Sequence, residues 1–297
     1  MPDRDTTARY DAIARPGGGF AMVALDARES MRGIFRDEGR PHEDDDLAAF
    51  KELAAHQVAP VASAVLCDPV LGARSIEAMR RDHPRTGLIV AVDDFEEPRY
   101  GPLKETRLDV AVMDRVVAGG GVTALKLYLF WRPDGTPHFR ADDARRFVEH
   151  SHELGVLALL EGVVTATAGD PGFDDALVRA AEDFGRFAPD VYKTQLPTFG
   201  RGDDDTVERE ARRVSDAVGV PWVVLSNGVE SSRFPSAVAA SCRGGASGLL
   251  AGRGVWRAAL ATDDPGAELA TGGQERLRAL VEVVDAEARP WRDAVRA

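Results

Sequence analysis

The sequence predicts an α/β fold, a (β/α)8 TIM barrel that forms a single domain over residues 1–297. Three observations support this prediction: the number of short apolar segments, the amphipathic segments between them, and the regular alternation of the two. A repeated strand-then-helix pattern is typical of parallel strands joined by crossover helices. Eight such units in about 300 residues fit a barrel, and an open doubly wound sheet is the alternative.

The apolar segments have the length and composition of buried parallel strands. They cover residues 19–26, 61–68, 87–94, 122–130, 155–162, 190–196, 221–228 and 246–254. Amphipathic patterns with cap residues at their ends predict helices over 45–58, 141–155, 174–188 and 205–219. The connection over 95–120 begins with a Pro- and Gly-containing loop, so its helix is expected from about Leu108. We place the barrel over about 19–256 and a C-terminal helix, broken near Pro290, over about 273–295.

Composition excludes several classes of protein. The chain has a net charge of −12 and no basic stripe, so we expect no nucleic-acid partner. It has no run of about 18 apolar residues and no apolar signal core near residue 1, which predicts a cytoplasmic protein without a membrane partner. The two cysteines, Cys67 and Cys242, make no disulfide framework and fit a reducing compartment.

Lysine is scarce in this chain, and its positions are informative. Only four of the 37 basic residues are lysine, namely Lys51, Lys104, Lys126 and Lys193. Lys126 and Lys193 lie within predicted strands, where a charge is costly to bury unless it has a partner or a use. Arginine stays protonated, whereas a lysine amine can lose its proton and act as a nucleophile. A salt-bridged structural role remains the alternative for both.

Alternation along the strands places these lysines in the barrel. In ALKLYLF the leucines would face the helices and Lys126 the interior, and Lys193 shares one face of its strand with Gln195. Active sites of TIM barrels form at the C-terminal strand ends, where this sequence also places Asp26 and Glu161. Further strand-end carboxylates, which could simply cap the next helix, are Asp68, Asp93 and Asp94.

These groups suit the chemistry of carbon–carbon bond cleavage. Two amines close together favour each other's neutral form, and a neutral amine attacks a ketone to form an iminium. Asp26 and Glu161 could then move protons. None of the six histidines follows a predicted strand, and zinc sites usually recruit imidazole. We therefore expect no metal and no cofactor, although an oxygen-only Mg²⁺ site stays open.

The last two strand ends predict an anion cradle built from backbone N–H groups and one arginine fork. Its candidate residues are Ser226, Asn227, Gly228, Gly252 and Arg253. Arg28, two residues after Asp26, is either a surface arginine or a ligand for the far anionic end of the substrate.

The segments that carry these residues resemble the class I aldolases of the tagatose 1,6-bisphosphate aldolase family. They include GGFAMVALDARESMRGIF, ALKLYLFWR, ALLEGVV, DVYKTQLPTFGRG and the stretch from PWVVLSNG to LLAGRGVW, and the resemblance runs from about Arg15 to the last helix. Within the family it is closest to the aldolases of sulfoquinovose degradation. These cleave 6-deoxy-6-sulfofructose 1-phosphate to dihydroxyacetone phosphate and 3-sulfolactaldehyde.

The resemblance implies a role for each candidate residue. Lys193 would be the Schiff-base lysine, and Asp26, Lys126 and Glu161 would handle protons. The C1-phosphate cradle would comprise Ser226, Gly228, Gly252 and Arg253, with Arg28 facing C6. The alternatives are an aldolase for tagatose 1,6-bisphosphate or a related ketose bisphosphate, and a non-catalytic sugar-phosphate-binding barrel. Barrels of this kind often associate, so we expect a homo-oligomer.

The sequence also departs from the family pattern at a few positions. Gln195 stands where the family usually has Glu, Ala27 where Gln is common, Gly162 where Pro is common, and Asn227 where a small residue is usual. A neutral Gln195 beside Lys193 would remove a charge that favours the protonated amine.

Overall fold

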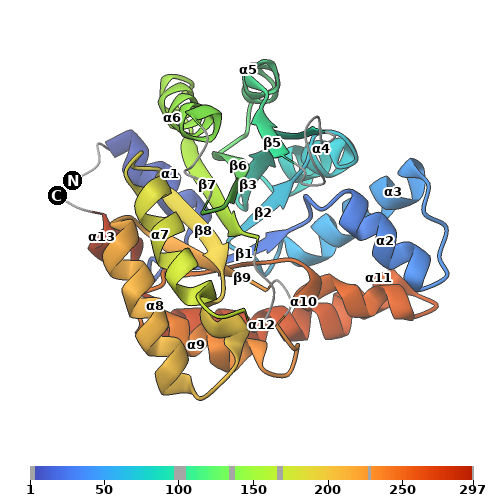
Figure 1. The fold of residues 1–297 in the computed structure, drawn as a ribbon. Helices are drawn as coiled ribbons and strands as arrows, with labels where there is room; N and C mark the ends of the chain where they lie inside the picture. Colours follow the sequence, from blue (N-terminus) through green and yellow to red (C-terminus); the bar gives the residue numbers. More distant parts are fainter. Residues whose placement is uncertain (1–3, 97–104, 134–137, 166–169, 227–228, 296–297) are drawn as a thin grey trace.

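The computed structural model describes residues 4–96, 105–133, 138–165, 170–226 and 229–295, and its centre is a closed barrel of eight parallel strands (Figure 1). Around the barrel the strand order is β1-β10-β9-β8-β7-β6-β3-β2. The strands are β1 (Phe20–Ala24), β2 (Ala64–Cys67), β3 (Gly87–Ala91), β6 (Ala124–Trp131), β7 (Leu157–Val164), β8 (Val191–Gln195), β9 (Trp222–Leu225) and β10 (Gly248–Ala251). Each lies within or overlaps a predicted strand, so the barrel prediction is confirmed and the open sheet is wrong.

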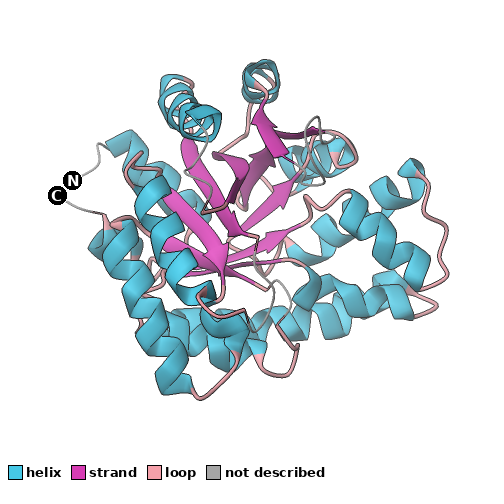
Figure 2. Ribbon diagram, viewed as in Figure 1, coloured by secondary structure: helices cyan, strands magenta, loops and turns pink. Residues whose placement is uncertain are grey.

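Helices surround the barrel on its outside (Figure 2). Those between the strands are α2 (Glu29–Asp37), α3 (Asp44–Val58), α4 (Ala73–Asp82), α5 (Val110–Ala118), α6 (His138–Glu153), α7 (Phe173–Gly185), α8 (Asp204–Val218) and α9 (Phe234–Arg243). After β10 come α10 (Arg253–Trp256), α11 (Pro265–Glu268), α12 (Gln274–Glu287) and α13 (Trp291–Ala294). Short 3-10 or π turns occupy Pro197–Gly200, Arg257–Ala261 and Leu269–Gly273. The closing helix breaks at Pro290, as predicted.

The connection after β3 contains a feature that the sequence did not predict. Two short strands, β4 (Asp93–Glu96) and β5 (Glu105–Leu108), pair antiparallel beside the barrel. The next helix, α5, begins at Val110, and the Asp109 side chain caps it by accepting a hydrogen bond from the Val112 N–H. Strands of four residues are too short to show a clear alternation. The consequence for the site is that Asp93 begins a strand of its own.

Alternation of side chains gives the molecule two apolar cores. Outward residues such as Leu125 and Leu127 pack under the helices, while inward residues such as Phe20 and Leu157 fill the lower barrel. Helix α1 (Arg4–Ile13), which the sequence did not predict, lies beside α13 at the N-terminal end of the strands (Figure 1). There the Tyr10 and Trp291 rings stack with centroids 4.3 Å apart. This apolar plug closes one end of the barrel.

Asp68 follows β2 and has a structural role. Its Oδ1 accepts hydrogen bonds from the Val70 and Leu71 N–H groups, at 3.0 and 2.8 Å, so it stabilises the turn that follows β2. The prediction that Asp68 caps the next helix is wrong, because α4 has Gly72 at its N-cap and no side-chain cap. Its Oδ2 pairs with Lys51 of α3, and both side chains are fully buried. A buried lysine in this chain is therefore not by itself a sign of catalysis.

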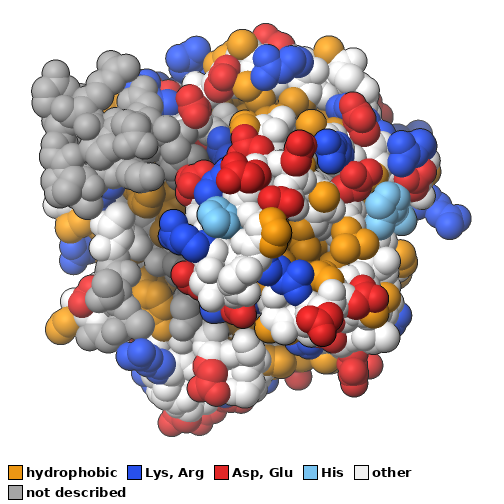
Figure 3. Space-filling model, turned by 90° about the vertical axis from the view of Figure 1, so that its right-hand side faces the viewer, with side chains coloured by type: hydrophobic (Ala, Val, Ile, Leu, Met, Phe, Trp, Pro, Cys, Tyr) orange, Lys and Arg blue, Asp and Glu red, His pale blue; other side chains and the backbone are white. Residues whose placement is uncertain are grey.

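Figure 3 shows one face of the molecule, which is charged and mixed in sign where the structure describes it. On the face shown in Figure 3, acidic and basic side chains alternate among apolar ones. None of the helices in the described ranges combines the length and the apolar character that a membrane span requires.

Candidate active site

A cavity of about 590 Å³ opens at the C-terminal ends of the barrel strands, opposite the apolar plug. Of the eight barrel strands, all but β2 and β3 contribute a residue to its wall. Its wall is made by Ala24, Asp26, Ala27, Arg28, Glu29, Ser30, Asp93, Asp94, Lys126, Tyr128, Glu161, Val163, Lys193, Leu225, Ser226, Leu250, Gly252, Arg253 and Trp256. The volume suits a small ligand of sugar-phosphate size.

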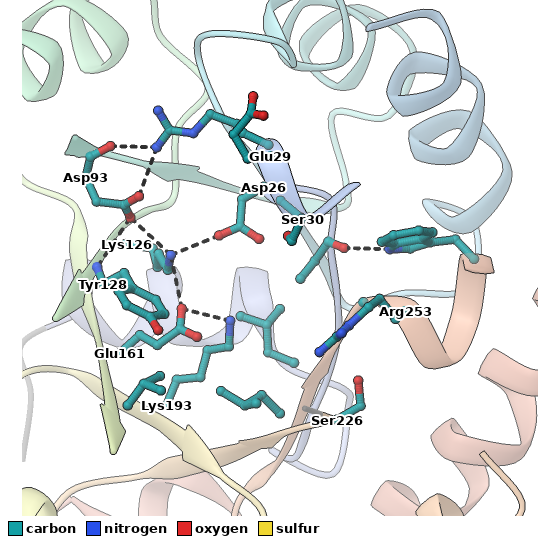
Figure 4. A pocket seen from close by; sticks show the side chains of 18 of the residues that line it. Asp26, Glu29, Ser30, Asp93, Lys126, Tyr128, Glu161, Lys193, Ser226 and Arg253 are labelled. Carbon is teal, nitrogen blue, oxygen red and sulfur yellow. Dashed lines mark hydrogen bonds and ion pairs between the residues drawn. The ribbon is translucent and has the colours of Figure 1, made fainter. Parts of the chain in front are cut away.

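Four predicted residues form a continuous charged chain on the floor of this cavity (Figure 4). The Lys193 Nζ lies 2.9 Å from Glu161 Oε2, and the Lys126 Nζ lies 3.0 Å from the same oxygen. Lys126 also donates to Asp26 Oδ2 at 2.9 Å. The strand register explains the contact, because Glu161 and Lys193 are directly paired on β7 and β8 and both point inward.

Electrostatics assign a different charge state to Lys126 than the sequence suggested. Burial lowers the pKa of Lys126, but contacts with Asp26, Asp93 and Glu161 outweigh it and raise that pKa well above its ordinary value. Lys126 is therefore an ammonium at neutral pH, and the expectation that proximity to Lys193 would favour its neutral form is wrong. For Asp26 the directions are reversed. Burial raises its pKa, but the charges of Lys126 and Lys193 lower that pKa by more, so Asp26 stays ionised.

Asp93 extends this series of contacting charged side chains, although the sequence did not single it out from other strand-end carboxylates. Its Oδ1 lies 3.0 Å from Lys126 Nζ, and its Oδ2 lies 3.0 Å from Arg28 Nη2. The side chains of Asp93 and Lys126 are each 3% exposed. Tyr128 also lines the cavity, and its ring centroid lies 5.2 Å from the Lys126 ammonium.

The predicted anion cradle lines the opposite side of the cavity. In Figure 4, Ser226 and Arg253 lie across the cavity from Asp93 and Glu29, with Lys193 and Asp26 between them. Partial burial, together with the charge of Arg257, lowers the pKa of Arg253, so an anion beside it would be stabilising. Gly252 also lines the cavity. Asn227 and Gly228, the other two predicted members, lie outside the described residues.

Gln195, the unusual neighbour of Lys193, has its own binding partner. Its Oε1 accepts from the Val164 N–H at 2.7 Å, and its Nε2 donates to the Val164 carbonyl at 3.0 Å. This pair of bonds needs one donor and one acceptor, which an amide provides and a carboxylate does not. Gln195 thus ties the end of β8 to the end of β7.

Gly162, the other departure within a strand, faces outward against Tyr192 of β8. A Cβ at this position would collide with the Tyr192 hydroxyl and lie 2.7 Å from Phe184 Cδ2. Tyr192 and Phe184 are fully buried. The bulk that Tyr192 adds here explains why this chain has glycine.

Comparison with known proteins agrees with this geometry. Residues 20–258 match the family model described as DeoC/LacD family aldolase. The chain belongs to the DeoC/LacD family of aldolases. The predicted enzyme type, an aldolase acting as a carbon–carbon lyase, is thereby confirmed.

Individual relatives of this DeoC/LacD aldolase are distant in sequence. It is 25% identical over 323 residues to the tagatose 1,6-diphosphate aldolase of Listeria monocytogenes, covering 96% of this chain and 94% of that one. Its fold matches the fructose-bisphosphate aldolase of Plasmodium falciparum with a TM-score of 0.73 and 13% identity, over 96% and 95% of the two chains. A Schiff base forming fructose-1,6-bisphosphate aldolase matches with a TM-score of 0.63 and 16% identity, over 94% and 99%.

Metal ligands are not gathered in the described part of the chain. Within it, no group of three or more His, Cys, Asp or Glu side chains is arranged to hold a metal ion. A metal-free reaction stays a prediction.

Proposed function

We propose that this aldolase forms a Schiff base through Lys193 and cleaves a ketose 1-phosphate. The observation that carries the proposal is the position of Lys193, 4% exposed on the cavity floor with its Nζ 2.9 Å from Glu161 Oε2. An amine at the bottom of a cavity can meet a ligand carbonyl, and an adjacent carboxylate can accept its proton.

The other charged residues fit successive steps of this reaction. The neutral Lys193 amine adds to the C2 carbonyl, and Glu161 protonates the departing hydroxyl so that water leaves and an iminium remains. Loss of the C4 hydroxyl proton to a carboxylate, for which Asp26 is placed, breaks the C3–C4 bond. The electron pair moves into the iminium, giving an enamine and a free aldehyde. Protonation of C3 and hydrolysis then release the second product and Lys193.

Lys126 serves this sequence as a fixed cation. Because its ammonium contacts both Glu161 and Asp26, it orients the two side chains, and it stabilises the ionised form of Asp26. It also offers a donor to a substrate oxygen between those carboxylates.

The proposed substrate is 6-deoxy-6-sulfofructose 1-phosphate, which would give dihydroxyacetone phosphate and 3-sulfolactaldehyde. Ser226, Gly252 and Arg253 would bind the C1 phosphate, and Arg28 would bind the C6 sulfonate. The charges around Arg28 favour an anion that carries a single negative charge. Asp93 already pairs with Arg28, and the exposed carboxylates of Glu29 and Asp94 line the same cavity. A sulfonate carries one negative charge, whereas a phosphate carries about 1.5 to 2 at pH 7.

Tagatose 1,6-bisphosphate or a related ketose bisphosphate is the second candidate. The Listeria monocytogenes relative is a tagatose 1,6-diphosphate aldolase, which favours this candidate. A non-catalytic sugar-phosphate-binding barrel is disfavoured by the family match and by the complete Lys193–Glu161–Lys126 arrangement.

Identification of the aldehyde product tests the substrate. The purified protein is given each ketose in turn, and kcat/KM and the aldehyde are measured. The proposal predicts 3-sulfolactaldehyde and a higher kcat/KM for the sulfonate. A clear preference for the bisphosphate, with glyceraldehyde 3-phosphate as product, would replace the first substrate with the second.

A further inference from the structure

Asp93 links the catalytic floor of the cavity to its far wall. It stands just after β3, at the first position of β4, and each of its carboxylate oxygens has a different cationic partner. Oδ1 contacts Lys126 at 3.0 Å, and Oδ2 contacts Arg28 at 3.0 Å. The two partners come from β6 and from the loop between β1 and α2, so the carboxylate joins three separate parts of the fold.

Both contacts are fixed by additional hydrogen bonds. Arg28 Nη2 also donates to the Asp93 carbonyl at 2.7 Å, so a single nitrogen is held by two oxygens of one residue. The Tyr128 N–H donates to Asp93 Oδ1 at 3.3 Å. The Asp93 side chain is 3% exposed and that of Arg28 is 16% exposed, which limits the conformations open to either.

We propose that Asp93 is a positioning residue that sets both the orientation of Lys126 and the place of Arg28 for the distal anion. This inference rests on the proposed function, in which Arg28 meets the charged group at C6. Through Lys126, Asp93 acts on the reaction of every substrate. Through Arg28, Asp93 acts only on substrates that carry an anion at C6. Its negative charge offsets part of the positive charge of Arg28 that such an anion meets.

The two roles separate in steady-state kinetics with two substrates. One is the preferred C6-charged ketose 1-phosphate from the product assay, and the other is fructose 1-phosphate, which has a neutral C6 hydroxyl. For Asp93→Asn we expect kcat to fall on the order of tenfold or more with both substrates. We also expect KM to change at least about fivefold more for the charged substrate than for fructose 1-phosphate. Asp93→Glu should recover part of the kcat loss.

Arg28→Gln isolates the second role and does not alter the buried floor. It should change KM for the charged substrate alone, and its effect should be non-additive with that of Asp93→Asn because the two residues are in contact. Equal KM changes for both substrates in Arg28→Gln, or strictly additive effects in the double variant, would overturn the inference. Arg28→Gln still tests the Arg28 role if Asp93→Asn does not fold.

Asp143→Asn is the matched control. Asp143 is also a buried aspartate paired with an arginine, Arg107 at 2.9 Å, but it does not line the cavity. Asp143→Asn should lower the stability of the protein, and its effect on kcat and KM should not differ between the two substrates. Failure of the Schiff-base proposal would instead appear as absence of a borohydride adduct on Lys193 in the unmodified protein, so the two failures are distinguishable.

Discussion

The Nζ atoms of Lys193 and Lys126 contact the same oxygen atom, Glu161 Oε2, at 2.9 and 3.0 Å. One carboxylate therefore contacts both the proposed nucleophile and a cation held in its protonated form. This arrangement lets Glu161 exchange a proton with Lys193 while Lys126 balances its charge. The following predictions test this relationship and the departures from the family pattern around it.

Glu161→Gln should remove proton transfer while keeping the shape of the site. We expect kcat to fall by about 10²–10⁴-fold, the usual contribution of a positioned acid–base group. Far-UV circular dichroism should be unchanged. A variant with near-normal kcat would show that Glu161 only pairs the lysines.

Lys126→Met should make the pH dependence of activity respond to Asp26. In the unmodified protein the pKa of Asp26 is held well below its ordinary value, so Asp26 stays ionised as the pH falls through 3.8. Without Lys126, burial raises the pKa of Asp26 with less opposition. The acid limb of the pH profile of kcat/KM should therefore shift to higher pH. An unshifted limb would contradict the role of Lys126 in keeping Asp26 ionised.

Gln195→Glu should weaken the tie between β7 and β8. At pH 7 the carboxylate cannot donate to the Val164 carbonyl, which costs about 1–3 kcal/mol of unfolding free energy. A protonated carboxyl can donate and accept as the amide does. The stability gap from the unmodified protein, measured by urea unfolding, should therefore narrow as the pH falls from 7 towards 5. A gap that stays constant or widens would argue against this role.

Gly162→Ala tests the outward packing of β7. The new methyl group would meet Tyr192 and Phe184, and overpacking of this kind costs about 1–3 kcal/mol. Adding Tyr192→Phe removes the hydroxyl that lies nearest, so the double variant should regain part of the loss in thermal unfolding. No recovery would place the strain elsewhere.

Much of the barrel and of its catalytic floor was predictable from local sequence. Alternation along ALKLYLF and DVYKTQL gave the inward direction of Lys126 and Lys193, and strand ends supplied Asp26 and Glu161. These inferences need only the period of a strand and the direction of the chain.

Long-range contacts set the limit of that prediction. Asp93 looked like other strand-end carboxylates because its partners lie 33 and 65 residues away. The charge state of Lys126 depends on three carboxylates from three strands or loops, so no local pattern reports it. Helix α1 was missed because its role depends on stacking of Tyr10 on Trp291, near the other end of the chain.

The most direct test of the account is covalent trapping at Lys193. The protein is incubated with ketose substrate and sodium borohydride, digested, and analysed by mass spectrometry. The account predicts a reduced adduct on the peptide that contains Lys193, and no adduct and no cleavage in Lys193→Ala with the fold intact. An adduct on Lys126 alone, or substrate cleavage that persists in Lys193→Ala, would contradict it.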